Sequence, residues 1–184
     1  MKEKLKKIEI IFDLSYLTIV VIIGFLLFTS NRISPIIGIS AFVLAFGDAF
    51  HLLPRVFNAS TQAKGLGKAI ASITMTLFYV FLCPIPVMIV LAAIRIFLCL
   101  LPQNQWLALK PPYHWGILRN VPLILMGIIT CFFLGYPLWI PITISFACYI
   151  PVVLWAHKYP MLGMLMLPKS IAYVAILVLF LTHR

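Results

Sequence analysis

The chain has 184 residues, of which 64% are hydrophobic and 10% are charged, and its formal net charge is +10. Soluble domains are about half apolar and about a quarter charged, so this composition excludes a soluble globular protein. At about 20 to 25 residues per span, the length predicts about six or seven transmembrane helices and no further domain. The basic residues lie between apolar runs, where they orient helices and contact anionic headgroups, so the charge does not indicate a nucleic-acid-binding protein.

The first two apolar runs predict a pair of helices, over about 10–30 and about 33–54. The basic start of the chain, residues 1–9, belongs in the cytoplasm by the positive-inside rule. We therefore expect a multi-pass protein of the cytoplasmic membrane with its N-terminus inside. The second helix returns to the cytoplasmic side and carries Asp48 and His51 in its last two turns. A polar inner loop is expected over residues 55–68.

Residues 66–102 decide the number of helices. As one span they give six helices, whereas a hairpin bent at Pro84 and Pro86 gives seven, with arms over about 66–83 and about 87–102. Two prolines two positions apart break a helix, because each removes a backbone donor and restricts the residue before it. The remaining helices are expected over about 119–134, 138–157 and 161–182, and the aromatic segment 103–116 along the inner interface.

Charge counting favours seven helices. In that arrangement the outer side holds only Arg32 and Arg184, and the other loop and terminal cations lie inside: Lys2, Lys4, Lys6, Lys7, Arg55, Lys64, Lys68, Lys110, Arg119 and Lys158. Six helices would move Arg95, Lys110, Arg119 and Lys158 outside and weaken the bias. The predicted fold class is an all-α polytopic membrane protein, one domain with a bundle of seven transmembrane helices and six as the alternative.

Seven helices also place four ionisable residues at similar depth. At about 1.5 Å per residue, Asp48 lies roughly 9 Å, Arg95 roughly 10 Å and Lys169 roughly 12 Å from the inner ends of their helices. Asp13 lies roughly 5 Å from the inner end of the first helix. Unpaired charge at membrane depth is costly, so we expect the two acids to lie close to the two bases.

Helical spacing gathers further polar side chains on these faces. Such faces are Asp48 with His51 and Arg55, Asp13 with Tyr16, Lys169 with Tyr173, and the stripe Lys68, Ser72, Thr76 and Tyr79. A polar face on a membrane helix turns toward protein or a water-filled cavity rather than toward lipid. At least four helices are therefore expected to direct polar faces at one place near the cytoplasmic surface.

Three interpretations of this cluster stay open. In a structural role, Asp13 and Asp48 neutralise Arg95 and Lys169. In an enzyme, a buried carboxylate and a nearby histidine act as acid and base while Arg95 or Lys169 stabilises negative charge. In a transporter, the same charges form a solute or ion site near the middle of the membrane.

A metal site is not predicted. Asp48, His51, His114 and His157 would all lie on the inner side, but His114 falls in a loop and His157 at a helix end. The chain also lacks the common nucleotide-binding and hydrolase motifs. The sequence thus predicts neither a metal nor a cofactor.

Two segments resemble the YhhN-type lysoplasmalogenase family. Gly47-Asp48 near the end of an apolar second helix is similar to the family's Gly-Asp signature, and residues 163–172 are similar to its late glycine-rich helix. The family consists of small polytopic membrane hydrolases that cleave the vinyl-ether bond of lysoplasmalogens, so the resemblance implies this activity with Asp48 in the site. The late family segment carries an aspartate where this chain has Lys169 or Ser170, so Asp13 would have to supply the second carboxylate.

The predicted function is an integral membrane enzyme that acts on a lipid or amphiphile from the inner leaflet, with a lysoplasmalogenase-like hydrolase as one form. We assign Asp48 as the acid/base, His51 as its partner and Asp13 as the second carboxylate. The predicted substrate-binding residues are Arg95, Lys169, Arg55, Tyr79 and Tyr16. The partners expected are membrane lipids and a small amphiphilic or anionic ligand. The alternatives are a small-solute carrier, a substrate-binding subunit that needs a protein partner, and a non-catalytic membrane partner protein.

Overall fold

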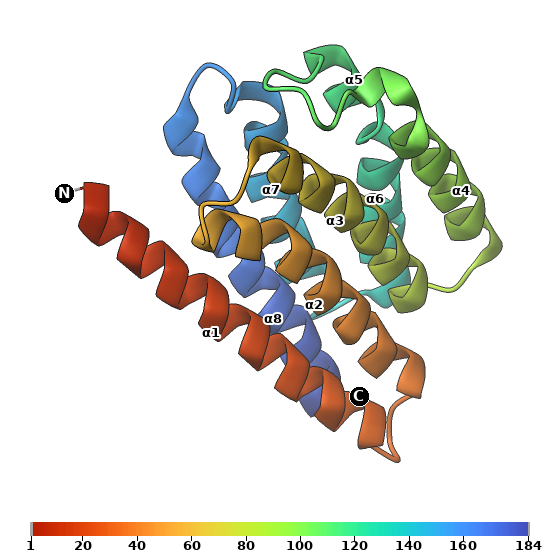
Figure 1. The fold of residues 1–184 in the computed structure, drawn as a ribbon. Coiled ribbons are helices and arrows are strands. Elements are labelled where there is room, and N and C mark those ends of the chain that lie inside the picture. The colour runs from red at the N-terminus through yellow and green to blue at the C-terminus, as the bar shows by residue number, and fades with distance from the viewer. Residues whose placement is uncertain (1, 184) are drawn as a thin grey trace.

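The computed structural model describes residues 2–183, and within them the side chains of residues 8–159 and 161–182. Every regular element in this part is a helix, which confirms the all-α fold class (Figure 1). The long helices are α1 (Lys2–Thr29), α2 (Pro35–Val56), α3 (Thr61–Leu82), α4 (Pro86–Leu100), α6 (Val121–Leu134), α7 (Trp139–Trp155) and α8 (Met166–His183). The short ones are α5 (Tyr113–Leu118) and the 3₁₀ segments η1 (Pro102–Asn104) and η2 (Pro160–Leu165). Four of the lysine side chains and one arginine used above for orientation lie outside the described residues: Lys2, Lys4, Lys6, Lys7 and Arg184.

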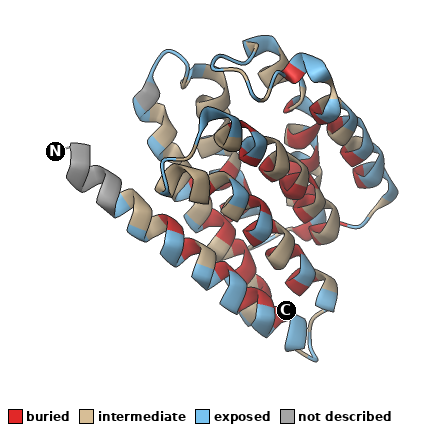
Figure 2. Ribbon diagram, in the orientation of Figure 1, coloured by how far each residue is buried: buried red, intermediate tan, exposed pale blue. Residues whose placement is uncertain are grey.

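The chain is a helical membrane protein. Five segments are long and apolar enough to cross a membrane: Ile8–Thr29, Pro35–Val56, Thr61–Leu82, Tyr113–Leu134 and Met161–Thr182. The apolar helices α4 and α7 are shorter. The buried residues gather toward the middle of the bundle (Figure 2). Many large apolar side chains are exposed, and Phe132, for example, is 85% exposed. Such a surface belongs against lipid rather than water.

The seven long helices form a closed ring. Each packs against the next long helix in the sequence, and α8 returns to pack against α1 (Figure 1). The connections that follow α2, α4 and α7 lie at the same end of the bundle as the start of α1, and we call this the N-terminal end. The connections that follow α1, α3 and α6 lie at the opposite end, with the C-terminus.

The segment 66–102, on which the predicted number of helices depends, is bent. α3 ends at Leu82, and α4 begins at Pro86 after Cys83, Pro84 and Ile85. Proline suits the first turn of a helix, because the N–H it lacks would have no intrahelical acceptor there. The chain therefore forms two helices here, as the seven-helix arrangement requires, although α4 has only 15 residues.

The structure has helix where a polar loop was expected over residues 55–68. α2 continues to Val56, and α3 begins at Thr61, where Ser60 Oγ accepts a hydrogen bond of 3.2 Å from the Ala63 amide. The glycines of this segment serve close packing. A Cβ at Gly65 would lie 2.0 Å from the Trp106 carbonyl oxygen, and one at Gly67 would lie 2.0 Å from that of Phe50. Glycine at these positions lets backbone approach backbone, so its presence did not indicate a loop.

Gly47 sets the crossing of α2 on α3. A Cβ at Gly47 would lie 1.7 Å from Thr74 Oγ1, so only glycine permits this approach. With Gly47 facing α3, the neighbouring Asp48 turns toward α1 and α8. The Gly47-Asp48 pair thus combines a packing residue with a residue of the interior polar cluster.

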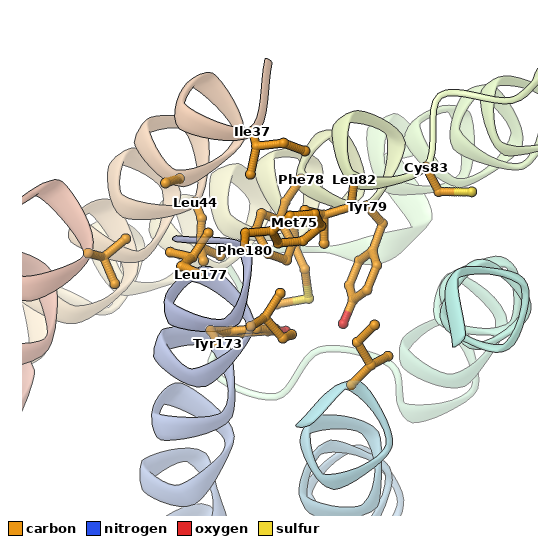
Figure 3. Close-up of a cluster of buried hydrophobic side chains, with 14 of the residues drawn as sticks. Ile37, Leu44, Met75, Phe78, Tyr79, Leu82, Cys83, Tyr173, Leu177 and Phe180 are labelled. Atoms are coloured by element: carbon orange, nitrogen blue, oxygen red, sulfur yellow. The ribbon is translucent and has the colours of Figure 1, made fainter. Parts of the chain in front are cut away.

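An apolar core fills the half of the bundle toward the opposite end. Phe78 packs edge-on against Tyr173, with ring centroids 5.6 Å apart, and Leu177 and Phe180 extend this contact along α8 (Figure 3). This core separates the polar residues at the N-terminal end from the opposite end of the bundle.

Candidate functional site

Two cavities at the N-terminal end of the bundle meet at Asp48. The first cavity, of about 250 Å³, lies between α1, α2 and the η2–α8 segment, and its polar walls include Asp13 and Ser170. The second cavity, of about 310 Å³, lies between α2, α3, α5, α7 and α8. Both cavities are lined by Asp48, His51, Met166 and Lys169. A molecule in either cavity would therefore contact the same polar centre.

Asp48 is tied to α1 by Tyr16. The Tyr16 hydroxyl donates a hydrogen bond of 2.6 Å to Asp48 Oδ2, and Tyr16 itself is only 3% exposed. The ring of Phe12 stacks parallel to that of Tyr16, with centroids 6.5 Å apart, and fixes its orientation. Asp48 Oδ1 receives no hydrogen bond from the described residues, so this oxygen stays available to a molecule in the cavities.

Lys169 lies between two aromatic rings. Its Nζ is 4.7 Å from the ring centroid of Tyr149 and 5.1 Å from that of Tyr173, while the residue as a whole is 3% exposed. Such cation–π contacts stabilise an ammonium group without neutralising it. The described part of the chain gives Lys169 no hydrogen bond or ion pair, although it attracts the Asp48 carboxylate electrostatically. Lys169 is therefore positioned by two aromatic rings but has no hydrogen-bond acceptor among the described residues.

Three further predicted residues line the first cavity. Asp13 is buried on α1, and Arg55 forms an ion pair with Glu9 that joins α2 to α1. His51 is placed one turn after Asp48, and its Nδ1 is buried without a hydrogen-bond partner in the described structure. The first cavity thus gathers Asp13, Asp48 and Lys169, three of the four residues of the depth argument, with His51 and Arg55 from the face shared with Asp48.

Arg95 differs from its prediction. It is fully buried, yet it pairs with no carboxylate in the described part of the chain. Its guanidinium donates to neutral acceptors instead: the carbonyls of Ser72 and Arg119, Thr76 Oγ1 and Asn120 Oδ1. The reason is position around the ring, because α4 packs between α3 and α6, away from α1. Arg95 lies behind the wall of the second cavity and lines neither cavity.

Tyr79 also lies outside the cavities. It is fully buried in the aromatic core beside Phe78 (Figure 3). Its ring contacts those of Phe78 and Phe146 at centroid distances of 5.4 and 5.5 Å. The four polar residues of the α3 stripe therefore lie in different surroundings. Lys68 and Ser72 reach the second cavity, whereas Thr76 binds Arg95 and Tyr79 enters the core.

Sequence reasoning missed the polar wall formed by the start of α6. Arg119 and Asn120 line the second cavity, and Tyr149 donates a hydrogen bond of 2.8 Å to Asn120 Oδ1. The signal was present as Arg119-Asn120 followed by Val121-Pro122, since an asparagine before a helix that carries proline in its first turn marks a helix start. It was assigned only to topology, because a charge near a helix end is common at the membrane interface.

The site offers acid–base and anion-binding chemistry rather than metal chemistry. Among the described residues, no group of three or more His, Cys, Asp or Glu side chains lies close enough to hold a metal ion. What the two cavities share is a carboxylate with one free oxygen, an imidazole and an ammonium. These groups suit proton transfer and the stabilisation of negative charge.

Comparison with protein-family models, with curated proteins and with solved structures finds no match to this chain.

Proposed function

We propose that the protein is an integral enzyme of the cytoplasmic membrane that acts on a lipid or amphiphile, with Asp48 as its acid/base. The observation that carries this proposal is the Asp48 carboxylate at the junction of two cavities, held at one oxygen by Tyr16 and open at the other. Asp13 faces the first cavity as a second carboxyl group. A lysoplasmalogenase-like hydrolase is the form that the Gly47-Asp48 resemblance suggests.

The orientation follows from the described charges. At the N-terminal end lie Arg55, Lys64, Lys68, Lys110, Arg119 and Lys158, whereas Arg32 lies at the opposite end. The positive-inside rule places the basic end in the cytoplasm. The chain then crosses the membrane several times with its N-terminus inside, and both cavities open toward the inner leaflet.

The walls of the first cavity suit an amphiphile. Ile8 and Met164 line it and are 60% and 51% exposed, so apolar surface runs from the cavity to the outside of the bundle. Leu52 and Leu167 add apolar wall beside the polar centre. This apolar wall suits an acyl chain whose polar end lies at Asp48.

Hydrolysis of an ester needs one group that gives a proton to the leaving oxygen and one that takes a proton from water, whereas hydrolysis of a vinyl ether begins with a proton given to the vinyl carbon, after which water adds. Asp48 and Asp13 line the same cavity and are assigned to these two roles, with His51 as the neighbouring base. With an ester substrate, Lys169 would stabilise the negative charge that develops on the carbonyl oxygen next to Asp48. A catalytic acid or base typically contributes about 10²- to 10⁴-fold to the rate.

A solute carrier is supported less well. A carrier needs a route between the two ends of the bundle. Beyond Lys169 on α8, however, Tyr173, Ile176 and Leu177 are closed inside the core (Figure 3).

The test is hydrolysis by the full chain in nanodiscs, with a lysoplasmalogen and its acyl-ester analogue as substrates and mass spectrometry of the products. Asp48→Asn should lower the rate at least about a hundredfold, as expected for loss of an acid/base. Lys158→Gln, a change on the exposed loop before η2, is the control and should leave the rate unchanged. Wild-type protein that turns over neither substrate, or an Asp48→Asn variant as fast as wild type, would refute the proposal.

A further inference from the structure

The second cavity carries an excess of positive charge. Three cationic side chains line it, those of Lys68, Arg119 and Lys169, against a single carboxylate, that of Asp48. Arg95 adds a fourth positive charge directly behind the wall, where it bonds to Asn120 and to the Arg119 carbonyl. Lys169 and Arg95 are buried, and buried charge without compensation is costly. A bound anion would compensate this excess of positive charge.

The cations around this cavity have free donors. The Arg119 guanidinium donates one hydrogen bond in the described structure, of 2.9 Å from Nη1 to Asn104 Oδ1, which leaves Nε and Nη2 unpaired. Lys68 and Lys169 donate no side-chain hydrogen bond to the described residues. Neither lysine forms an ion pair there, because the only ion pair in the described part of the chain joins Arg55 to Glu9. The site thus presents charged N–H groups that the protein itself does not satisfy.

The Arg119 side chain is fixed in place. Its guanidinium carbon lies 4.0 Å from the ring centroid of Trp106, and the Trp106 indole N–H donates a hydrogen bond of 2.8 Å to the Cys99 carbonyl. Asn104, the acceptor from Arg119, is itself buried and donates to the Leu101 carbonyl at 3.0 Å. A guanidinium held between a ring and an amide loses little freedom when it binds a ligand.

We propose that the second cavity binds a phosphate or phosphodiester group through Lys68, Arg119 and Lys169. A planar guanidinium matches two oxygens of such a group, and ammonium groups on other sides neutralise its remaining charge. A cavity of about 310 Å³ accommodates a group of this size together with water. The anion source is either free phosphate or the headgroup of a lipid.

The assignment of this group as the headgroup of the substrate rests on the proposed function. Asp48 and Lys169 line both cavities, so a phosphate in the second cavity places the adjoining part of the same molecule beside Asp48. The apolar walls of the first cavity would then take its chain. The substrate would be a phosphate-bearing amphiphile rather than a neutral one.

The test measures binding without turnover, on the full chain with Asp48→Asn in detergent. Trp106 stacks on Arg119, so its fluorescence reports occupancy of the site, and a Trp106→Phe variant identifies its signal. The probes are inorganic phosphate, lysophosphatidic acid, and a monoacylglycerol with the same acyl chain. We expect lysophosphatidic acid to bind at least about tenfold more tightly than the monoacylglycerol, since charge-assisted hydrogen bonds are gained only with the phosphate.

Variants separate the site from general surface charge. Lys68→Gln should weaken binding about tenfold, and Arg119→Gln should weaken it further. Lys68 is exposed and donates no side-chain hydrogen bond to the described residues, so its variant should fold even if Arg119→Gln does not. Lys110→Gln removes the same charge from the adjacent exposed loop without touching the cavity, and it should bind like its parent.

A response to inorganic phosphate that Lys68→Gln weakens identifies a free-anion site, and a response to lysophosphatidic acid alone identifies a headgroup site. Equal affinity for the monoacylglycerol, no binding of either phosphate probe, or equal binding by Lys68→Gln and Lys110→Gln overturns the proposal. Phosphate binding by a wild-type protein that hydrolyses nothing would reject the enzyme and retain the anion site. Hydrolysis without phosphate binding would retain the enzyme and reject the anion site.

Discussion

The bond between Tyr16 and Asp48 can be measured as a coupling energy between α1 and α2. A hydrogen bond to a charged group contributes about 1.5–3 kcal/mol in soluble proteins, whereas interhelical bonds in membranes average about 0.6 kcal/mol and reach about 1.7 kcal/mol. The short 2.6 Å distance and the burial of Tyr16 favour the upper part of the membrane range. We expect a coupling of about 1–2 kcal/mol between Tyr16→Phe and Asp48→Ala.

Equilibrium unfolding in mixed micelles, followed by circular dichroism, gives the four free energies that this double-mutant cycle needs. Tyr136→Phe is the matched control, because Tyr136 is exposed at the opposite end and should show additive behaviour with Asp48→Ala. The hydrolytic activity of the same variants distinguishes a structural role of Asp48 from a catalytic one. A carboxylate that is only structural would change stability alone, whereas an acid/base would lose turnover in Asp48→Asn at nearly unchanged stability. Additive free energies for Tyr16 and Asp48 would contradict the hydrogen bond as we describe it.

Three further predictions concern packing and orientation. Gly47→Val should destabilise the protein by about 3 kcal/mol because its side chain would overlap Thr74, and Thr74→Gly in the same chain should recover part of the loss in thermal unfolding. Asn120→Ala should cost about 2 kcal/mol in the same assay, since a buried guanidinium and a tyrosine hydroxyl lose their shared acceptor. In a background without native cysteines, an impermeant thiol reagent should label Arg32→Cys but not Lys110→Cys in intact cells, and both after permeabilisation. The reverse labelling would contradict the proposed orientation.

The position of each side chain along its helix could be predicted from the sequence, because it depends on local features. Apolar runs and basic flanks set where each helix begins, and a fixed rise per residue then sets the height of each side chain. Asp13, Asp48 and Lys169 were assigned similar heights in this way, and the structure brings all three to the wall of one cavity. The bend before Pro86 was predictable for the same reason, since proline acts on its immediate neighbours.

Position around the ring could not be predicted from the same features. Arg95 was expected beside the two acids, but α4 packs against α3 and α6, so its guanidinium donates to carbonyls, a hydroxyl and an amide rather than to Asp13 or Asp48. Which helices become neighbours depends on side-chain fit along their whole length. Gly65 shows the same limit, because its role depends on the distant backbone of Trp106. Residues whose partners are remote in sequence carry no local signal of that partnership.

The closure of the ring by α1 and α8 imposes an order of assembly on the site. Tyr16 and Asp48 belong to the first two helices to be inserted, so their hydrogen bond can form as soon as that hairpin packs. Lys169 enters with α8, the last helix described, after every other wall of the two cavities is in place. A truncation before α8 would remove Lys169, so the Asp48 carboxylate would keep its bond to Tyr16 but lose the cation that attracts it.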